Sequence, residues 1–297
     1  MEKNNYILGA GINGLIAAHY LKDYKIIGFT NCQEAHDFPL GPRYIHYSEN
    51  VKELLSDLKL STDTEIVKIG YFLDGAIENT ATDEFRKDYF YKTRGKGKPF
   101  KSSMSGDKNK LKVFKVKPDE LYKTLLEKYQ DRVIKEKITS INRFKLIITT
   151  EQQTYEAGKI VTTLPAPIFF RLTGEHRIAE CFKAKPKIFY LVQDNFDFEG
   201  YDYIYFADAD TPMTRATKFG THLIAEVANI EDCEEFEKQR VIIKKVVLPN
   251  AQITNKAVFG SLNPIKCIGR FACWKHNKKI NEVVEDVRRL WKLLHWI

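Results

Sequence analysis

The sequence has no apolar stretch as long as a membrane-spanning helix needs, which is about 18 residues. Its first residues also lack the basic, apolar and small-residue order of a signal peptide. We therefore expect a cytoplasmic protein with no membrane partner. The five cysteines are odd in number and form no C-x-x-C pair, which argues against zinc or a redox-active disulfide. Free thiols and no metal site are expected.

Motifs of the common hydrolases are missing as well. No Ser-His-Asp order, H-E-x-x-H motif or pair of carboxylates stands out. The reactive chemistry of an enzyme with this sequence would then belong to a bound cofactor. With 297 residues, 43% of them apolar, the chain can bury the core of one large domain or of two interleaved ones. Its net charge of +8 suits an anionic partner, either a phosphorylated small molecule or a nucleic acid.

A glycine-rich turn near the N-terminus carries the clearest functional signal. The start of the chain predicts a strand, a tight turn, a helix and a second strand, and Gly9, Gly11 and Gly14 form a G-x-G-x-x-G motif in the turn. At Gly11 the backbone can approach a pyrophosphate, while the helix N-terminus supplies free N–H groups and a positive dipole end. The pattern predicts a dinucleotide-binding βαβ unit with Ile12 and Asn13 beside the ligand.

The second strand of such a unit usually ends in an acid that hydrogen-bonds the adenosine ribose. Thr30 and Asn31 occupy that place here. Because a hydroxyl or an amide can also hydrogen-bond a ribose, both residues remain candidate cofactor contacts.

Periodicity predicts the other elements. Apolar residues at helical spacing predict helices at 50–60, 118–129 and 280–294, and a charged helix is expected at roughly 231–244. Short β-rich runs predict a meander over 133–163 and strands at 186–193, 201–206, 221–228 and 266–274. The alternation at 201–206 and 221–228 predicts one face of those strands in water.

A basic segment spans residues 86–117, with twelve Lys or Arg and two acids. Glycines and serines interrupt any periodicity, which predicts a solvated loop or a lid. The same charge would also suit the phosphates of a nucleic acid, although no recognised DNA- or RNA-binding motif is present.

Three further segments, together with the turn, resemble UDP-galactopyranose mutase and, more broadly, the flavin amine oxidase superfamily. Residues 40–48 (LGPRYIHYS) are similar to the mutase segment G-P-H-x-F-H-T, and residues 212–215 (PMTR) are similar to P-x-T-R. Residues 268–275 (IGRFACWK), followed by a helix that opens with Ile280-Asn281, are similar to G-R-x-A-x-Y-K and the M-D/N pair. The chain is shorter than a typical mutase, which leaves a reduced substrate domain.

The resemblance implies FAD as the cofactor and assigns places around it. It implies cofactor contacts from Gly41, Arg43, Ile138, Gly269, Arg270, Ile280 and Asn281, in addition to the glycine turn. It implies an active site with Arg43, His46, Arg215 and Arg270, whose guanidinium groups suit the oxygens of an anionic substrate. His46 could carry a proton or only hydrogen-bond the flavin, and Arg43 could lie at the pyrimidine end or on the N5 side of the flavin.

We therefore predict an α/β fold with two parts. A Rossmann-type FAD-binding domain, with a parallel sheet and a β-meander, is expected from residues 1–60, 111–170 and 255–297. A smaller mixed α+β substrate domain with an antiparallel sheet is expected from 61–110 and 171–254. Three functions stay open: a mutase-like flavoenzyme acting through flavin N5 on a small anionic substrate, an amine-oxidase-type oxidoreductase, and a flavin-binding protein that acts on nucleic acid.

Overall fold

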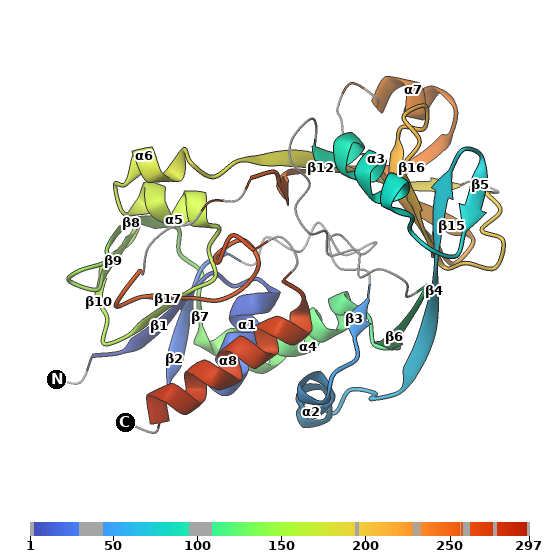
Figure 1. Ribbon diagram of the computed structural model, residues 1–297. Helices are drawn as coiled ribbons and strands as arrows, with labels where there is room; N and C mark the ends of the chain where they lie inside the picture. The colour runs from blue at the N-terminus through green and yellow to red at the C-terminus, as the bar shows by residue number, and fades with distance from the viewer. Residues whose placement is uncertain are drawn as a thin grey trace. The chain divides into compact units, whose positions relative to one another are not determined.

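The computed structural model of the chain describes residues 3–29, 44–94, 109–193, 196–227, 231, 233–255, 257, 262–275 and 278–295 (Figure 1). These residues form two units: Met1–Asp63, Phe114–Lys183 and Asn255–Ile297 make up the first unit, and Thr64–Val113 and Ala184–Thr254 make up the second. The α/β fold class expected from the sequence is confirmed. No helix within the described residues is both long and apolar enough to span a bilayer.

The first unit is built on a parallel sheet. Its strands lie in the order β17 (Lys266–Cys267), β11 (Ile160–Thr162), β1 (Asn5–Leu8), β2 (Tyr24–Ile27) and β7 (Val133–Ile134). Between β1 and β2 runs helix α1 (Ile12–Tyr20), which confirms the βαβ unit. Parallel strands covered on both faces favour continuous apolar runs, and the buried residues of β1 and β11 follow this rule.

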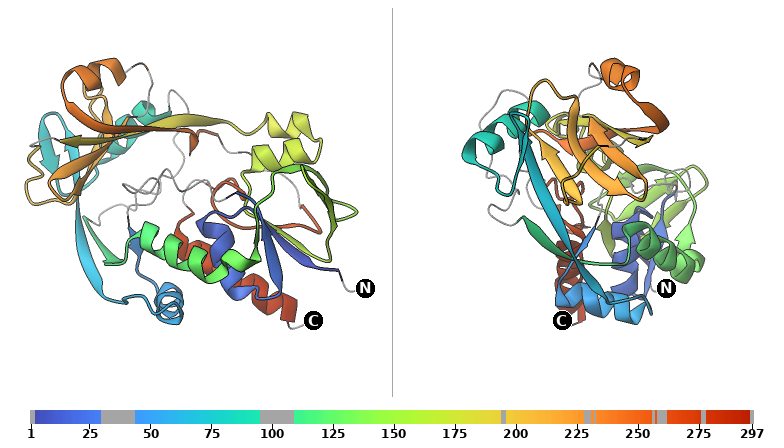
Figure 2. Two further views of the ribbon diagram at one scale, coloured as in Figure 1. Left: turned by 180° about the vertical axis from the view of Figure 1, so that it is seen from behind. Right: turned by 90° about the vertical axis from the view of Figure 1, so that its right-hand side faces the viewer.

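Three helices surround α1 or pack close to it. They are α2 (Glu49–Asp57), α4 (Pro118–Tyr129) and α8 (Ile280–His295), and α1 contacts both α4 and α8 (Figures 1 and 2). The expected apolar stripe of α8 is buried, with Val283, Val284 and Val287 in the same core as Leu15 and Ile16 of α1. Because α1 is enclosed in this way, its sequence is apolar almost all round.

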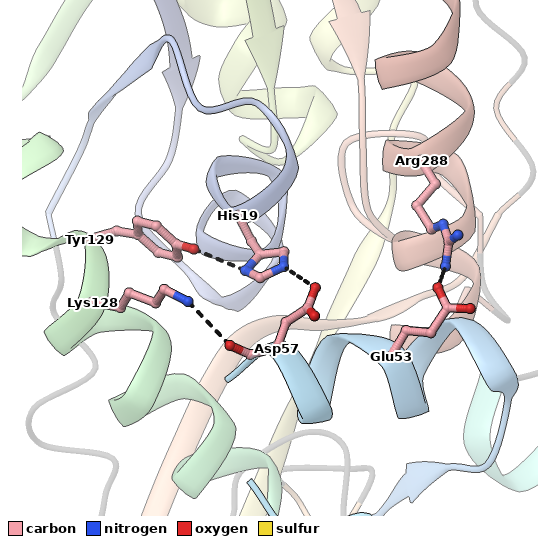
Figure 3. A network of polar contacts seen from close by, with 6 residues as sticks. All are labelled: His19, Glu53, Asp57, Lys128, Tyr129 and Arg288. Carbon is pink, nitrogen blue, oxygen red and sulfur yellow. Dashed lines mark hydrogen bonds and ion pairs between the residues drawn. The ribbon is translucent and has the colours of Figure 1, made fainter. Parts of the chain in front are cut away.

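The polar network in Figure 3 ties α1 to α2 and α4. The Tyr129 hydroxyl donates to Nδ1 of the buried His19 ring (2.9 Å), and Nε2 of that ring donates to the Asp57 carboxylate (3.3 Å). Burial acts first to lower the pKa of His19, which keeps the ring neutral at pH 7. Arg288 of α8 also pairs with Glu53 of α2. The helix layer beside α1 is therefore fixed by polar contacts as well as by its core.

The expected meander forms a small antiparallel sheet with two helices near it. It contains β8 (Ile138–Asn142), β9 (Ile147–Thr150) and β10 (Thr154–Glu156), and the order is β10-β9-β8. Helices α5 (Ala166–Leu172) and α6 (His176–Ala179) follow β11, and the 3₁₀ turn η2 (Gln130–Arg132) precedes β7. A two-residue strand, β3 (Ile45–His46), leads into α2.

The second unit has a mixed sheet. Its strands lie in the order β16 (Val241–Ile253), β12 (Ala184–Gln193), β15 (His222–Val227), β14 (Met213–Phe219), β13 (Tyr203–Phe206), β4 (Thr64–Leu73) and β6 (Lys110–Phe114), and β5 (Ala76–Glu78) pairs with β4. Neighbours from β16 to β13 are antiparallel, whereas β13 and β4 are parallel. The sheet is antiparallel from β16 to β13, as the sequence predicts, and the parallel pair of β13 and β4 makes it mixed.

Two helices contact opposite faces of this sheet. In α3 (Asp83–Arg94), Phe85 and Tyr89 contact Tyr71 and Tyr205. On the other face, Phe236 of α7 (Cys233–Lys238) belongs to the apolar core of the unit. Because the sheet is covered on both sides, β13 and β15 are almost completely buried, and the prediction that one of their faces lies in water is wrong.

Three other expectations about segments are corrected. Residues 86–94 of the basic segment lie in α3, because aromatic residues at helical spacing pack on the sheet, and residues 110–114 form β6. The helix expected at 231–244 ends at Lys238, and an alternating strand begins at Val241. The strand expected at 266–274 is only two residues long, because the backbone turns at Gly269, with φ of 98°, and at Trp274, with φ of 50°.

Candidate functional site

The turn between β1 and α1 leaves room at one glycine and none at another. A side-chain carbon at Gly14 would lie 1.9 Å from the Gly9 carbonyl oxygen, so the third glycine lets the helix pack directly against the turn. At Gly11, by contrast, such a carbon would have no heavy atom of the described residues within 4 Å. This open space lies where the G-x-G-x-x-G pattern predicts the approach of a diphosphate.

Within the part of the chain that the structure describes, no side chain caps the N-terminus of α1. Gly11 is the N-cap residue and offers no side chain, and the first turn contains no acidic residue. A helix start of this kind presents N–H groups and a positive partial charge. Ile12 and Asn13, the expected cofactor contacts, are the first two residues of α1.

Thr163, which sequence reasoning did not single out, fixes this turn. Its hydroxyl donates to the carbonyl oxygens of Leu8 (3.0 Å) and Gly9 (3.3 Å) from the end of β11. The backbone N–H of Thr163 also donates to Leu8 (2.8 Å). In the sequence, the signal for this role is the run VTTLP at 161–165, in which the hydroxyl of Thr163 comes directly after a buried strand.

The other end of α1 is capped by a single side chain. The Arg132 guanidinium donates to the carbonyl oxygens of Ala18 (2.8 Å), Leu21 (2.6 Å) and Tyr24 (2.9 Å). A cation at a helix C-terminus satisfies its free carbonyls and offsets its negative dipole end. The helix is therefore capped at its C-terminus and has no side-chain cap at its N-terminus.

The segment around Gly269 meets the glycine turn. A side-chain carbon at Gly269 would lie 2.4 Å from Nδ2 of Asn13, and its φ of 98° favours glycine. The next residue, Arg270, has its guanidinium carbon 5.4 Å from the centre of the Phe271 ring. The structure thus brings together two motifs that lie far apart in the chain, since Asn13 and Gly269 are separated by 269 − 13 = 256 positions.

The start of α8 supplies the third part of the candidate site. Ile280 is its first residue and is buried. The Oδ1 atom of the next residue, Asn281, is also buried, and it has no hydrogen-bond partner within the described residues. A buried acceptor without a donor is costly, so this atom suits a donor from a ligand.

His46 and Lys279 flank the same helix start, where β3 contacts α8. Burial, followed by the positive charge of Lys279, lowers the pKa of His46 to about 4. Burial also lowers the pKa of Lys279, although Glu282 opposes this. His46 is therefore a neutral imidazole at pH 7, and a cation lies close to it. Lys279 was missed in the sequence because it follows the expected motif rather than belonging to it.

Ile138 lies at the start of β8 and is half-buried, in the meander beside the parallel sheet. Thr30, Asn31, Gly41 and Arg43 lie outside the described residues. The placing of these four candidate contacts thus stays a prediction.

Arg215 lies in the second unit, in a buried charge cluster. Its guanidinium and the Lys187 ammonium both pair with the Glu226 carboxylate, which is fully buried. The guanidinium carbon also lies 5.2 Å from the centre of the Tyr203 ring. Two cations from different strands thus share one buried carboxylate.

A hollow of about 860 Å³ lies elsewhere in the second unit. Four aspartates line it, with Tyr91, Lys92 and Lys185 among its other residues. Lys92 is already engaged, since it donates to the backbone carbonyl of Asp208 (2.5 Å). The excess of carboxylates does not suit an anionic ligand. Within the described residues, no group of three or more His, Cys, Asp or Glu side chains could hold a metal ion.

Comparison with solved structures shows which known folds this chain resembles. The structure of reduced UDP-galactopyranose mutase superposes with a TM-score of 0.68 at 14% identity, covering 100% of this chain and 95% of that chain. The fold is similar to that of UDP-galactopyranose mutase. A CLA-producing fatty acid isomerase from P. acnes gives a TM-score of 0.69 at 14% identity, covering 100% of this chain and 99% of that one.

Putrescine oxidase bound to putrescine gives a TM-score of 0.61 at 12% identity, covering all of both chains. No family model and no curated protein matches the sequence. The resemblance to UDP-galactopyranose mutase that the motifs indicate is thus confirmed for the fold, and it extends over the whole chain rather than over the motif-bearing segments alone.

Proposed function

We propose that the first unit binds FAD and that the protein is a flavoenzyme acting on a small anionic substrate, in the manner of UDP-galactopyranose mutase. The observation that carries this proposal is the open space at Gly11, beside a helix N-terminus with no side-chain cap and no acidic residue in its first turn. A diphosphate is the ligand that suits a glycine turn of this kind.

The residues around the turn fit the rest of such a cofactor. Asn281 offers a buried acceptor at the start of α8, where Glu282 of the first turn already accepts from the backbone N–H of Lys279. Lys279 and Arg270 add positive charge near it. The Asn281 oxygen would accept from an N–H of the bound group, whereas the two cations would stabilise negative charge on the pyrimidine edge of a reduced isoalloxazine, because fixed positive charges lower the energy of an anion placed against them.

When bound, the flavin would supply N5 as the reacting atom. The chain's own contribution is to orient and to neutralise. His46 is neutral at pH 7, so it can accept or donate one hydrogen bond without adding charge. As the resemblance implies, Arg215 would bind the anionic group of the substrate, since a guanidinium group suits phosphate and carboxylate oxygens.

The first experiment is a visible absorption spectrum of the purified protein, followed by chromatography of the released cofactor. We expect a flavin spectrum and FAD. A protein that stays colourless after incubation with FAD would refute cofactor binding.

The second experiment tests the reaction type. We expect protein reduced with dithionite to bind and isomerise UDP-galactopyranose, and the Arg215→Lys variant to bind it more weakly while keeping its FAD. A protein that binds FAD yet neither binds nor isomerises this sugar nucleotide would reject the mutase activity alone.

An amine-oxidase-type reaction is the second candidate. It is supported by the similarity to putrescine oxidase over the full length of both chains. Anaerobic mixing of the oxidised protein with candidate amines would then bleach the flavin absorbance. No bleaching with any amine, together with isomerase activity after reduction, would reject this candidate.

A further inference from the structure

A cysteine and a lysine lie in contact beside the Gly269 turn. The Cys273 thiol is 3.6 Å from Nζ of Lys278, and it also lies 3.3 Å from the backbone carbonyl oxygen of Cys267. The Lys278 side chain is only 8% exposed, and its ammonium pairs with Asp286 of α8. A thiol, an amine and a carboxylate therefore form one chain of contacts in a partly buried place.

Both partners of this contact are held by other bonds. The backbone N–H of Cys273 donates to Gly269 (3.0 Å), and Phe271 accepts from the N–H of Ala166 (3.0 Å). On the other side, the ion pair with Asp286 restrains Lys278. Because neither partner is free to drift, the sulfur and the nitrogen stay at reacting distance without a large loss of entropy on reaction.

We propose that Cys273 and Lys278 are an oxidative modification site, at which hydrogen peroxide joins them through a covalent S–O–N bridge. The bridge forms from one thiol, one neutral amine and two molecules of hydrogen peroxide, with release of three molecules of water. The sulfur is oxidised to the sulfenate level and the nitrogen to the hydroxylamine level, each by two electrons, and both peroxides are reduced. The proton that leaves the Lys278 ammonium beforehand can pass to Asp286.

The environment sets the rate of this reaction. Burial acts first to raise the pKa of the Cys273 thiol, and the ammonium of Lys278 opposes it. Since the thiolate is the species that peroxide oxidises, we expect the rate to rise about tenfold per pH unit while the thiol is mostly protonated. Burial raises the pKa of the Cys267 thiol to about 12, which keeps this neighbour protonated.

The bridge would join two segments of the candidate site. Its formation does not depend on the proposed function. Cys273 belongs to the turn that carries Gly269 and Arg270, and Lys278 lies two residues before the start of α8. A bond between them would fix the turn and the helix start relative to each other. Hydrogen exchange in both segments should then slow on oxidation.

Mass spectrometry of the whole protein and its tryptic peptides tests the proposal. After peroxide treatment at pH 8 to 9, roughly around the range where thiolates form, we expect a species with one added oxygen and two fewer hydrogens. Its peptides containing Cys273 and Lys278 should be linked, and dithiothreitol should restore the starting mass.

Matched variants assign the atoms. Lys278→Arg keeps the charge and the pairing with Asp286, and Cys273→Ser keeps the size, yet both should abolish the linked species. Cys181→Ser removes an exposed thiol and should leave the linked species in place. Sulfinic or sulfonic acid at Cys273 with an unmodified Lys278, a disulfide to Cys267, or no reaction at Cys273 would each overturn the proposal.

Discussion

The Gly11→Ala substitution separates cofactor binding from folding. The backbone at Gly11 is extended (φ −73°, ψ 177°), which any residue adopts, and the new methyl group meets no heavy atom within 4 Å. Loss of glycine at an N-cap costs about 0.5–1 kcal/mol, so the protein without cofactor should still fold. The methyl group would, however, occupy the space in which a diphosphate approaches the helix.

The size of the effect follows from the bonds that would be lost. Displacing a phosphate from two N–H groups removes two charge-assisted hydrogen bonds at about 1.5 kcal/mol each, or about 3 kcal/mol in all. At 1.4 kcal/mol per factor of ten, FAD should bind about a hundredfold more weakly. Titration of the cofactor-free protein with FAD, followed by flavin fluorescence, measures this change.

A control at Gly14 makes the test specific. A side-chain carbon there would lie 1.9 Å from a backbone oxygen, so Gly14→Ala should unfold the first unit rather than only weaken binding. Thermal melting of the cofactor-free proteins compares the two variants. If Gly11→Ala binds FAD as tightly as the natural sequence, or melts as early as Gly14→Ala, then the open space at Gly11 is not a cofactor site.

Three other predictions concern charge and packing. His46 has a folded-state pKa of about 4, below the value of about 6.5 in an unfolded chain. Its contribution to stability is therefore present above pH 6.5 and is lost as the pH falls towards 4, at up to about 1.4 kcal/mol per pH unit. In urea unfolding, His46→Asn should lose less stability between pH 7 and pH 5 than the natural sequence does, and an equal loss would contradict this. Glu226→Gln removes the buried carboxylate from two partly buried cations and should cost about 3–5 kcal/mol in the same assay. Glu151→Gln, in an exposed pair, should cost less than about 1 kcal/mol, and equal costs would refute the argument. Gly269→Ala places a carbon 2.4 Å from Asn13 and should lower the melting temperature. Adding Asn13→Gly should restore part of that loss in the double variant, whereas melting-temperature changes that simply add would exclude the contact.

The sequence predicted the first unit well because its elements are specified locally. The glycine turn, β1 and α1 lie within one short stretch, and Pro118 marks the start of α4. Buried parallel strands such as β11 also stand out as short apolar runs. The pairing of Asn13 with Gly269 could be expected only through the resemblance to known flavoenzymes, since nothing in the local pattern joins them.

The second unit was harder to predict because tertiary packing overrides its local pattern. Charge density concealed α3, whose aromatic residues pack on the sheet, and a run of charged residues before Val241 concealed the start of β16. The partners of Arg215 come from strands that are distant in the chain, so their convergence on Glu226 has no signal in any single segment.

The two ends of helix α1 differ in how their backbone groups are satisfied. Arg132 satisfies the carbonyl end, while none of the described side chains accepts from the amide end. An anion that arrives at the amide end therefore completes the helix, so its binding energy adds directly to the stability of the first unit. A comparison of the melting temperature with different anions would thus rank them by how well they suit the amide end of α1.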